Sequence, residues 1–413
     1  ELGEIEATLA QHPGVAAAVA GTPDRRRLLA WYVPRPLPVP PSPAAPAWDA
    51  AVTAARAAHL AQPPSAPELL AATDALGARA VTWIAAGLAR LGLFTADGQA
   101  HDLDALHSLV TPAYHRWLRR GLDLLQGSGL LRQAGTTWIA PRALSPAAPP
   151  PLDLGPAGAH LVDLLDRYGQ QLMPILRGEA SALELFYAGG QVDAATDFYA
   201  DAFTDALAVL AAFLDVLPSG LRALEVGGGG GGTTRVALPH ARASSYLFTD
   251  VSRLFLEHAA RAFPGARTAV LDLDRPPADQ DLRPGQFDLL IAGGALHVAR
   301  ELRATLAHLA GLLAPGGALV LIEATRFWPM MQLLTALQPG FDGFTDTDLR
   351  RDHCLLDLPD WTAVLASAGF ETDVGPGVYD IHSPRVPPVA EIERAIVSML
   401  GKLGKKATEY DGV

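Results

Sequence analysis

The chain has 413 residues and a mass of 43.4 kDa, enough for roughly two or three domains. Hydrophobic residues make up 49% of it, which excludes global disorder, and the net charge of −12 disfavours nucleic acid or an anionic membrane as a partner. Its single cysteine, Cys354, excludes an internal disulfide and a cysteine-based zinc site. The acidic start, without an initiator methionine or an apolar signal core, predicts a cytoplasmic protein that is a piece of a longer chain.

Two proline-rich stretches divide the chain. The first, Pro34–Pro46, holds seven prolines in thirteen residues and predicts an extended spacer, and Ser145–Pro151 is a second break. We therefore expect a short fragment over 1–33, a linker over 34–47, a unit of mostly helices over 48–150, a larger domain over 151–384, and a C-terminal linker or helix over 385–413.

The unit over 48–150 is predicted to be helical. Apolar residues at three- and four-residue steps predict helices over Ala51–Leu60, Pro67–Leu91, Leu103–Val110 and Ala113–Leu125, and Thr136–Ile139 predicts one strand of a small ribbon. Helices followed by a ribbon are typical of a winged-helix unit, whose usual partner is DNA. Because the expected DNA-binding face carries only a few arginines within an acidic protein, a packing or lid role is favoured over DNA binding.

The larger domain alternates strands and helices, which predicts an α/β fold with a mostly parallel sheet. In such sheets ligands bind beyond the carboxyl ends of the strands, so the residues that directly follow the strands carry the most weight. The predicted strands are Ala223–Val226, Tyr246–Thr249, Thr268–Leu271, Phe287–Ala292 and Ala318–Glu323.

A run of six glycines, Gly227–Gly232, follows the first of these strands. Its place between a strand and a predicted helix argues against a flexible linker, because a glycine loop there brings backbone close to a ligand. Such loops bind either the pyrophosphate of a dinucleotide or S-adenosylmethionine. An acid before the loop, Glu225, suits the cationic amino acid end of S-adenosylmethionine and would repel a pyrophosphate.

Two further acids follow the next strands. Asp250 ends the second strand, where a carboxylate accepts ribose hydroxyls, and Asp272 follows the third, where a methyltransferase contacts the adenine. One acid after each of three strands favours S-adenosylmethionine over a nicotinamide cofactor. We expect the remaining cofactor-binding residues to be Gly227, Gly229, Val251, Leu273 and Gly293.

The segments LEVGGGGGGTT, YLFTDVS, FDLLIAGGALH and LLAPGGALVLIEAT, in this order, resemble class I S-adenosylmethionine-dependent methyltransferases. More narrowly, they resemble the C-methyltransferase domains of polyketide synthases and non-ribosomal peptide synthetases. The resemblance covers about residues 50–380 and includes the segment FTDTDLR, which follows the last of these motifs. The resemblance implies a Rossmann-like core with a mostly parallel seven-stranded sheet and an N-terminal helical lid. It also implies a partner carrier protein, whose phosphopantetheine arm tethers the substrate, and neighbouring synthetase domains.

Both ends of the chain lie outside that resemblance. ELGEIEATLAQHPGV and LLAWYVP are similar to the C-terminal subdomain of a synthetase adenylation domain, but the proline-containing strand and catalytic lysine segment of that family are missing before residue 48. Adenylation by this chain alone is therefore not expected. Val389–Leu403 has helical apolar spacing, which suits a packing helix better than a helix that approaches a carrier protein.

The expected catalytic residues are His297, Glu323 and Tyr199. His297 follows the fourth strand and is the candidate base for removing a proton from an α-carbon, and Glu323, at the end of the adjacent strand, would hold its imidazole. In the resembling C-methyltransferases a His–Glu pair occupies these positions, and a tyrosine matching Tyr199 lines the pocket. The alternatives are a structural role for the histidine, an ion pair between Glu323 and Arg326, and core packing for the tyrosine.

The chain departs from the family at two places. Gly230 stands where the family has Thr or Ser, and Phe341–Phe344 stands where it often has Gly-Trp-Trp. No histidine cluster with metal-ligand spacing is present, so no metal site is expected. The predicted activity is S-adenosylmethionine-dependent C-methylation of a tethered thioester. The alternatives are O- or N-methylation by the same fold, and a degenerate domain that acts as an epimerase or a structural insert.

Overall fold

The computed structural model describes residues 2–11, 15–21, 29–34, 40–61, 67–186, 204–373, 378–380 and 393–400. The chain forms two compact units, residues 1–41 and 42–413. In the first unit, helix α1 (Leu2–Ala10) precedes an antiparallel pair of strands, β1 (Val15–Gly21) and β2 (Leu29–Pro34). The carboxylate of Glu6 on α1 accepts a hydrogen bond from the backbone N–H of Ala20 at 2.8 Å, which ties the helix to β1.

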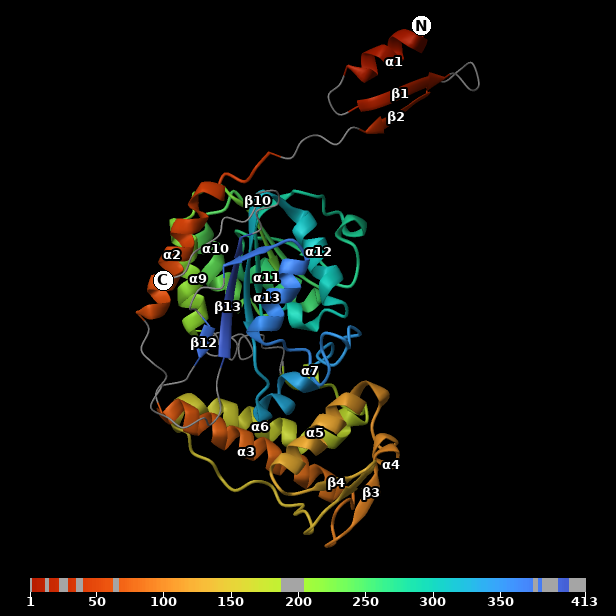
Figure 1. Ribbon diagram of the computed structural model, residues 1–413, viewed down its shortest axis with the longest axis vertical. Helices are drawn as coiled ribbons and strands as arrows, with labels where there is room; N and C mark the ends of the chain where they lie inside the picture. The colour runs from red at the N-terminus through yellow and green to blue at the C-terminus, as the bar shows by residue number, and fades with distance from the viewer. Residues whose placement is uncertain are drawn as a thin grey trace. The chain divides into compact units, whose positions relative to one another are not determined.

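The second unit contains an α/β core built on one sheet, whose strands lie in the order β11-β13-β10-β9-β6-β7-β8, with β12 paired to β13 (Figure 1). The parallel strands are β6 (Arg222–Val226), β7 (Ser245–Asp250), β8 (Arg267–Val270), β9 (Phe287–Gly293) and β10 (Leu313–Ala324). The strand order changes direction between β6 and β9, which lie side by side. A sheet of this order has its ligand crevice at that switch point, beyond the carboxyl ends of the strands.

The sheet is buried on both faces, which explains its nearly continuous apolar strands. Along β9, Leu289 and Ile291 pack on one face and Leu290 and Ala292 on the other, as expected from the period of two in a strand. Figure 1 shows the helices on either side of the sheet. The helices of the core are α2 (Trp48–Leu60), α9 (Thr204–Val216), α10 (Gly232–Ala241), α11 (Arg253–Ala262), α12 (Leu302–Leu312) and α13 (Leu358–Ser367).

Helix α2 packs on the α/β core, although its sequence was assigned to the helical unit. Trp48 stacks on Phe213 of α9 with ring centroids 6.1 Å apart, and its indole N–H donates to the carbonyl of Gly316 at 2.7 Å. The end of the proline-rich linker is also part of the core, because the Ser42 N–H donates to the Pro315 carbonyl at 2.8 Å. Contacts with the α/β core therefore begin before residue 48 and continue through α2.

A helical subdomain, residues 67–176, has its own core. Its helices are α3 (Pro67–Arg90), α4 (Leu103–His107), α5 (His115–Gly127) and α6 (Gly155–Leu176). A small antiparallel sheet, with the order β3-β5-β4, forms the predicted ribbon from β3 (Ala100–Asp102), β4 (Arg132–Ala134) and β5 (Thr137–Ile139). The subdomain includes α6, which was assigned to the larger domain: Asp166 of α6 accepts hydrogen bonds from both Arg79 and Trp83 of α3.

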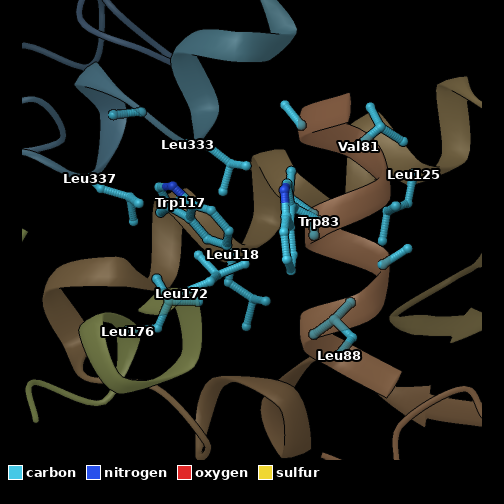
Figure 2. Packing of buried hydrophobic residues seen from close by; sticks show 14 of the residues in the cluster. Val81, Trp83, Leu88, Trp117, Leu118, Leu125, Leu172, Leu176, Leu333 and Leu337 are labelled. Carbon is cyan, nitrogen blue, oxygen red and sulfur yellow. The ribbon is translucent and has the colours of Figure 1, made fainter. Parts of the chain in front are cut away.

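Residues that follow β10 complete the core of the helical subdomain. Leu333 and Leu337 lie beside Trp117 of α5 (Figure 2), and the indole N–H of Trp117 donates to the carbonyl of Gln332 at 2.6 Å. Gly169 on α6 lies so close to Trp83 that a Cβ atom there would come within 2.2 Å of the indole. The helical subdomain and the segment after the last parallel strand thus form one packed body.

The C-terminal part of the chain differs from the expected helix. Residues Glu393–Leu400 form strand β13, which runs antiparallel to β10 from Ala318 to Ala324. Two short strands, β11 (Glu371–Asp373) and β12 (Val378–Asp380), also pair with β13. The sheet therefore continues beyond the predicted boundary at 384. Among the described residues, no helix is long and apolar enough to cross a membrane.

Candidate active site

The glycine loop between β6 and α10 is packed so closely that side chains are excluded. A Cβ atom on Gly228 would lie 2.2 Å from the ring of Phe248, and one on Gly227 would lie 2.7 Å from Ala295. Gly227, Gly229 and Gly231 all have positive φ, which favours glycine. Around Gly229 no atom lies within 4 Å of a Cβ position, so the loop presents bare backbone to open space there. This is the cradle that a close-bound cofactor requires.

Asp250, at the end of β7, holds the glycine loop. Its two carboxylate oxygens accept hydrogen bonds from the backbone N–H groups of Gly229 at 3.0 Å and Ser252 at 2.8 Å. Burial raises the pKa of this carboxyl, and the backbone hydrogen bonds oppose that effect. Each oxygen keeps a lone pair that can accept a further hydrogen bond. Next to it, the apolar side chain of Val251 is 67% exposed.

Glu225 lies below the loop and is fully buried. One of its oxygens, Oε2, accepts hydrogen bonds from the hydroxyls of Thr234 at 2.7 Å and Tyr246 at 2.8 Å. Burial raises the pKa of Glu225 to about 7, and these hydrogen bonds lower it only in part. The other oxygen, Oε1, has no hydrogen-bond partner in the described part of the chain. Glu225 thus anchors the start of α10, a role the sequence did not indicate, while its second oxygen is buried without a hydrogen bond.

The remaining predicted cofactor residues lie along the same edge of the sheet. Asp272 and Leu273 follow β8, beside the end of β7, where the N–H of Leu271 donates to the Asp250 carbonyl at 3.2 Å. The Asp272 carboxylate accepts from the N–H of Asp274 at 3.0 Å. Gly293 ends β9, and a Cβ there would lie 2.2 Å from the hydroxyl of Thr233. The structure therefore brings the predicted residues together around the switch point.

His297 and Glu323 form a hydrogen-bonded pair next to this loop. Nδ1 of His297 lies 2.7 Å from Oε2 of Glu323, whose side chain has no exposed surface. The pair forms because β9 and β10 are parallel neighbours, with Gly293 opposite Ile322, so the residues that follow meet at one edge. Oε1 of Glu323 also accepts from the N–H groups of Leu296 and His297. With Nδ1 donating to the carboxylate, Nε2 carries the lone pair that can accept a proton.

Two residues to which the sequence analysis gave no role in the site contact this pair. Phe341 packs edge-on against the imidazole of His297, with ring centroids 6.2 Å apart. Arg350, in the FTDTDLR segment, donates to the backbone carbonyl of His297 at 2.9 Å. Sequence reasoning missed Arg350 because its contact is with backbone far away in the chain. Tyr199, the third predicted catalytic residue, lies outside the described residues.

No group of three or more potential metal ligands occurs among the described residues. The groups that do meet here are a partly buried histidine–carboxylate pair, a glycine loop and two acids, which suit proton transfer and the binding of an organic cation. The donor set suits S-adenosylmethionine, because Oε1 of Glu225 can meet its amino group and Asp250 can meet its ribose.

Comparison with known proteins gives the class. A family model described as "Methyltransferase domain" matches residues 224–319. A second, described as "Cobalamin-independent synthase, Catalytic domain", matches residues 357–409, of which 374–377, 381–392 and 401–409 lie outside the described residues. Its described part, α13 with three strands, belongs to the same α/β core. The chain is thus an S-adenosylmethionine-dependent methyltransferase of the class I, Rossmann-like fold.

More specific relatives are known. The chain is 34% identical over 331 residues to polyketide synthase ThaQ from Burkholderia thailandensis, covering 71% of this chain and 16% of that synthase. The CurJ carbon methyltransferase superposes with a TM-score of 0.73 at 27% identity, covering 88% of this chain and all of the other. The DszA carbon methyltransferase superposes with a TM-score of 0.71 at 24% identity, covering 89% and 99%. The chain is thus similar to C-methyltransferase domains of the polyketide synthase type, and it spans less than a fifth of the length of that synthase relative.

None of the three relatives named above is a peptide synthetase or an adenylation domain. The similarity of residues 1–33 to an adenylation subdomain therefore stays a prediction. Helix α1 and the strand pair β1–β2 of the first unit do not test that similarity.

Proposed function

We propose that this domain transfers a methyl group to the α-carbon of an acyl thioester that is tethered to the phosphopantetheine arm of a carrier protein, within an assembly-line synthase. The observation that carries the proposal is the His297–Glu323 pair at the carboxyl edge of the sheet, beside the glycine loop. Methylation of carbon needs a base, because a C–H bond must first lose its proton. Methylation of a ready nucleophile such as an amine does not.

Residues of this chain carry out the proton transfer. His297 takes the α-proton on Nε2, and the electron pair left on carbon is delocalised into the thioester carbonyl, and further into a neighbouring keto group where one is present. Glu323 keeps the imidazole in the tautomer with the proton on Nδ1 and stabilises the imidazolium that forms. A base positioned in this way typically contributes about 10²–10⁴-fold to the rate.

The cofactor supplies an electrophilic methyl group on a sulfonium centre when bound. We propose that the loop Gly227–Gly231 and Oε1 of Glu225 hold its amino acid end, and that Asp250 accepts the ribose hydroxyls. Val251, Asp272 and Leu273 would then surround the adenine. Gly293, at the switch point, lets the backbone approach the reactive centre because no side chain intervenes.

The proposal on the substrate rests on the relatives. One is a polyketide synthase and two are carbon methyltransferases. We propose a thioester because the α-carbon of a thioester is acidic enough for a histidine base. Phe341, at the imidazole of His297, would form one wall of the acyl site. We propose Tyr199 as a further group near the thioester carbonyl.

The test uses S-adenosylmethionine and an acetoacetyl thioester of N-acetylcysteamine, with product methylation read by mass spectrometry. His297→Ala should abolish methyl transfer and leave calorimetric binding of S-adenosylmethionine nearly unchanged. The control is His240→Ala, which removes an exposed histidine that also pairs with a carboxylate, Asp215 at 2.8 Å. If His297→Ala retains turnover, or if the two variants lose activity equally, the proposed role of His297 is wrong.

A further inference from the structure

We propose that Arg350, held by Asp346, is a positioning residue for His297: it fixes the backbone from which the catalytic imidazole projects. The inference deepens the proposed function and rests on His297 being the base. Arg350 lies 53 residues after His297 in the chain and does not contact its side chain through any hydrogen bond in the described structure. Its action is therefore on the main chain.

The guanidinium of Arg350 binds the carbonyl side of the His297 turn. One terminal nitrogen donates to the carbonyl of His297 at 2.9 Å. The other donates to the carbonyls of Ala299 at 2.7 Å and Arg300 at 3.0 Å. A single planar group thus joins three carbonyls of one short segment, which a flexible ammonium group cannot do with the same geometry.

Asp346 sets the orientation of that guanidinium. Its two oxygens accept from Nε and a terminal nitrogen of Arg350 at 2.7 and 2.8 Å, the bidentate geometry of a strong ion pair. One of these oxygens also accepts from the backbone N–H of Leu302 at 2.9 Å, at the start of α12. The pair therefore fixes both the turn and the helix that follows it.

The same turn is held on its other side by the carboxylate of the catalytic pair. Glu323 accepts from the N–H groups of Leu296 and His297, whereas Arg350 donates to carbonyls. The turn is a single 3-10 turn, Leu296–Val298, so it has few hydrogen bonds of its own. Its conformation depends on these two buried charged groups.

Burial shows that this arrangement is more than a surface ion pair. Arg350 is 1% and Asp346 5% exposed, so both charges have been taken out of water. Buried ion pairs often contribute little net stability compared with apolar residues of the same volume. Burying the Arg350–Asp346 ion pair costs desolvation free energy. A role in fixing the conformation of the His297 turn accounts for the presence of this pair next to it.

The helical subdomain supports the pair from outside. The ring of Phe344 lies between two guanidinium groups, that of Arg116 of α5 at 4.0 Å from its centroid and that of Arg350 at 5.2 Å. Arg116 also donates to the Phe344 carbonyl at 2.6 Å. Packing of the helical subdomain is therefore transmitted to the His297 turn through Phe344 and Arg350.

The experiment compares Arg350→Lys and Asp346→Asn in the full chain with the same thioester and S-adenosylmethionine. Because a displacement of about 1 Å at a catalytic group can cost about 10²-fold, we expect kcat to fall about 10- to 100-fold in both variants. The dissociation constant for S-adenosylmethionine should stay within about twofold of the parent, since neither residue touches the glycine loop. The matched control is Arg79→Lys, which removes the bidentate geometry of a partly buried arginine–aspartate pair inside the helical subdomain. It should lower the melting temperature without lowering kcat.

A double-mutant comparison separates this inference from the proposed function. If Arg350 acts through His297, then adding Arg350→Lys to His297→Ala should cause no further loss of the residual rate. An Arg350→Lys variant with parental kcat, or a fall in kcat matched by Arg79→Lys at equal loss of stability, would overturn the positioning role. Retained activity in His297→Ala would instead overturn the base. Should Arg350→Lys not fold, Asp346→Asn, which keeps the volume of the side chain, carries the test alone.

Discussion

Arg120 of α5 and Asp342 form a buried, bidentate ion pair, with both nitrogen–oxygen distances at 2.9 Å. Each side chain is 7% exposed. The guanidinium also donates to the side chain of Gln332 at 2.7 Å and lies 5.5 Å from the ring centroid of Phe341. This pair joins the helical subdomain to the segment that carries the aromatic wall of the proposed acyl site.

Asp342→Ala should therefore be strongly destabilising, because it leaves the charge of Arg120 buried without its partner. We expect a loss of about 3–5 kcal/mol in the free energy of unfolding, measured by denaturant titration. The control is Asp123→Ala, which breaks the exposed Arg119–Asp123 pair on the same helix and should cost less than about 1 kcal/mol. Equal losses in the two variants would contradict the structural role of the buried pair.

Gly228→Ala should weaken cofactor binding, because the new methyl group would meet the Phe248 ring at 2.2 Å and displace the loop. We expect at least a tenfold rise in the dissociation constant for S-adenosylmethionine, measured by calorimetry, with the fold retained by circular dichroism. Gly311→Ala on α12 is the control, since no atom lies within 4 Å of its Cβ position. That substitution should leave binding unchanged and stabilise the helix by up to about 1 kcal/mol.

Glu225 should make the stability of the cofactor-free protein depend on pH. Burial raises its pKa from 4.5 to about 7, so the folded state holds a proton that the unfolded state has released between these values. Stability contributed by this group is therefore lost as pH rises, by about 3 kcal/mol from pH 4.5 to pH 7. Glu225→Gln should remove that component of the pH dependence of the melting temperature. A curve that is unchanged in this variant would contradict the raised pKa.

The same residue gives a test of where the cofactor's amino group binds. A cation beside Oε1 favours the carboxylate, so binding of S-adenosylmethionine near pH 6.5 should release protons. Calorimetry in buffers of different ionisation enthalpy measures that release directly. Glu225→Gln should bind without it. Proton release that persists in Glu225→Gln would place the titrating group elsewhere.

Trp48→Ala should destabilise the α/β core even though Trp48 lies in a segment that resembles a lid. The side chain has no exposed surface and stacks on Phe213, so we expect a loss of about 3–5 kcal/mol. Val216→Ala, at the end of α9 with 41% of its surface exposed, should cost well under 1 kcal/mol. A Trp48→Ala protein as stable as Val216→Ala would show that α2 does not belong to the core.

The fold and much of the candidate site were predictable because buried parallel strands leave clear apolar runs and their ends meet at one edge. That reasoning placed His297 next to Glu323 and Asp250 next to the glycine loop. It failed where the spacing of apolar residues did not distinguish a helix from a strand. The apolar residues of Val389–Leu403 suit a helix, yet Glu393–Leu400 forms a strand that pairs with β10 and β11. Hydrogen bonds to these distant strands determine its conformation.

Other features had no local signal. The amphipathic pattern of α2 shows that one face is buried but not which core buries it, and its partner α9 lies more than a hundred residues away. The contacts of Arg350 with three backbone carbonyls depend on the path of the chain and not on the identity of the residues contacted. Such contacts appear only when the three-dimensional structure is known.

The attachment of Ser42 and Trp48 to the start of β10 determines the side from which the preceding chain joins the catalytic core. Pro315 and Gly316, which accept their hydrogen bonds, lie at the amino ends of the parallel strands. The glycine loop and His297 lie at the opposite, carboxyl ends. Ser42 and Trp48 are therefore fixed to the core at the ends of the parallel strands opposite to those that carry the glycine loop and His297.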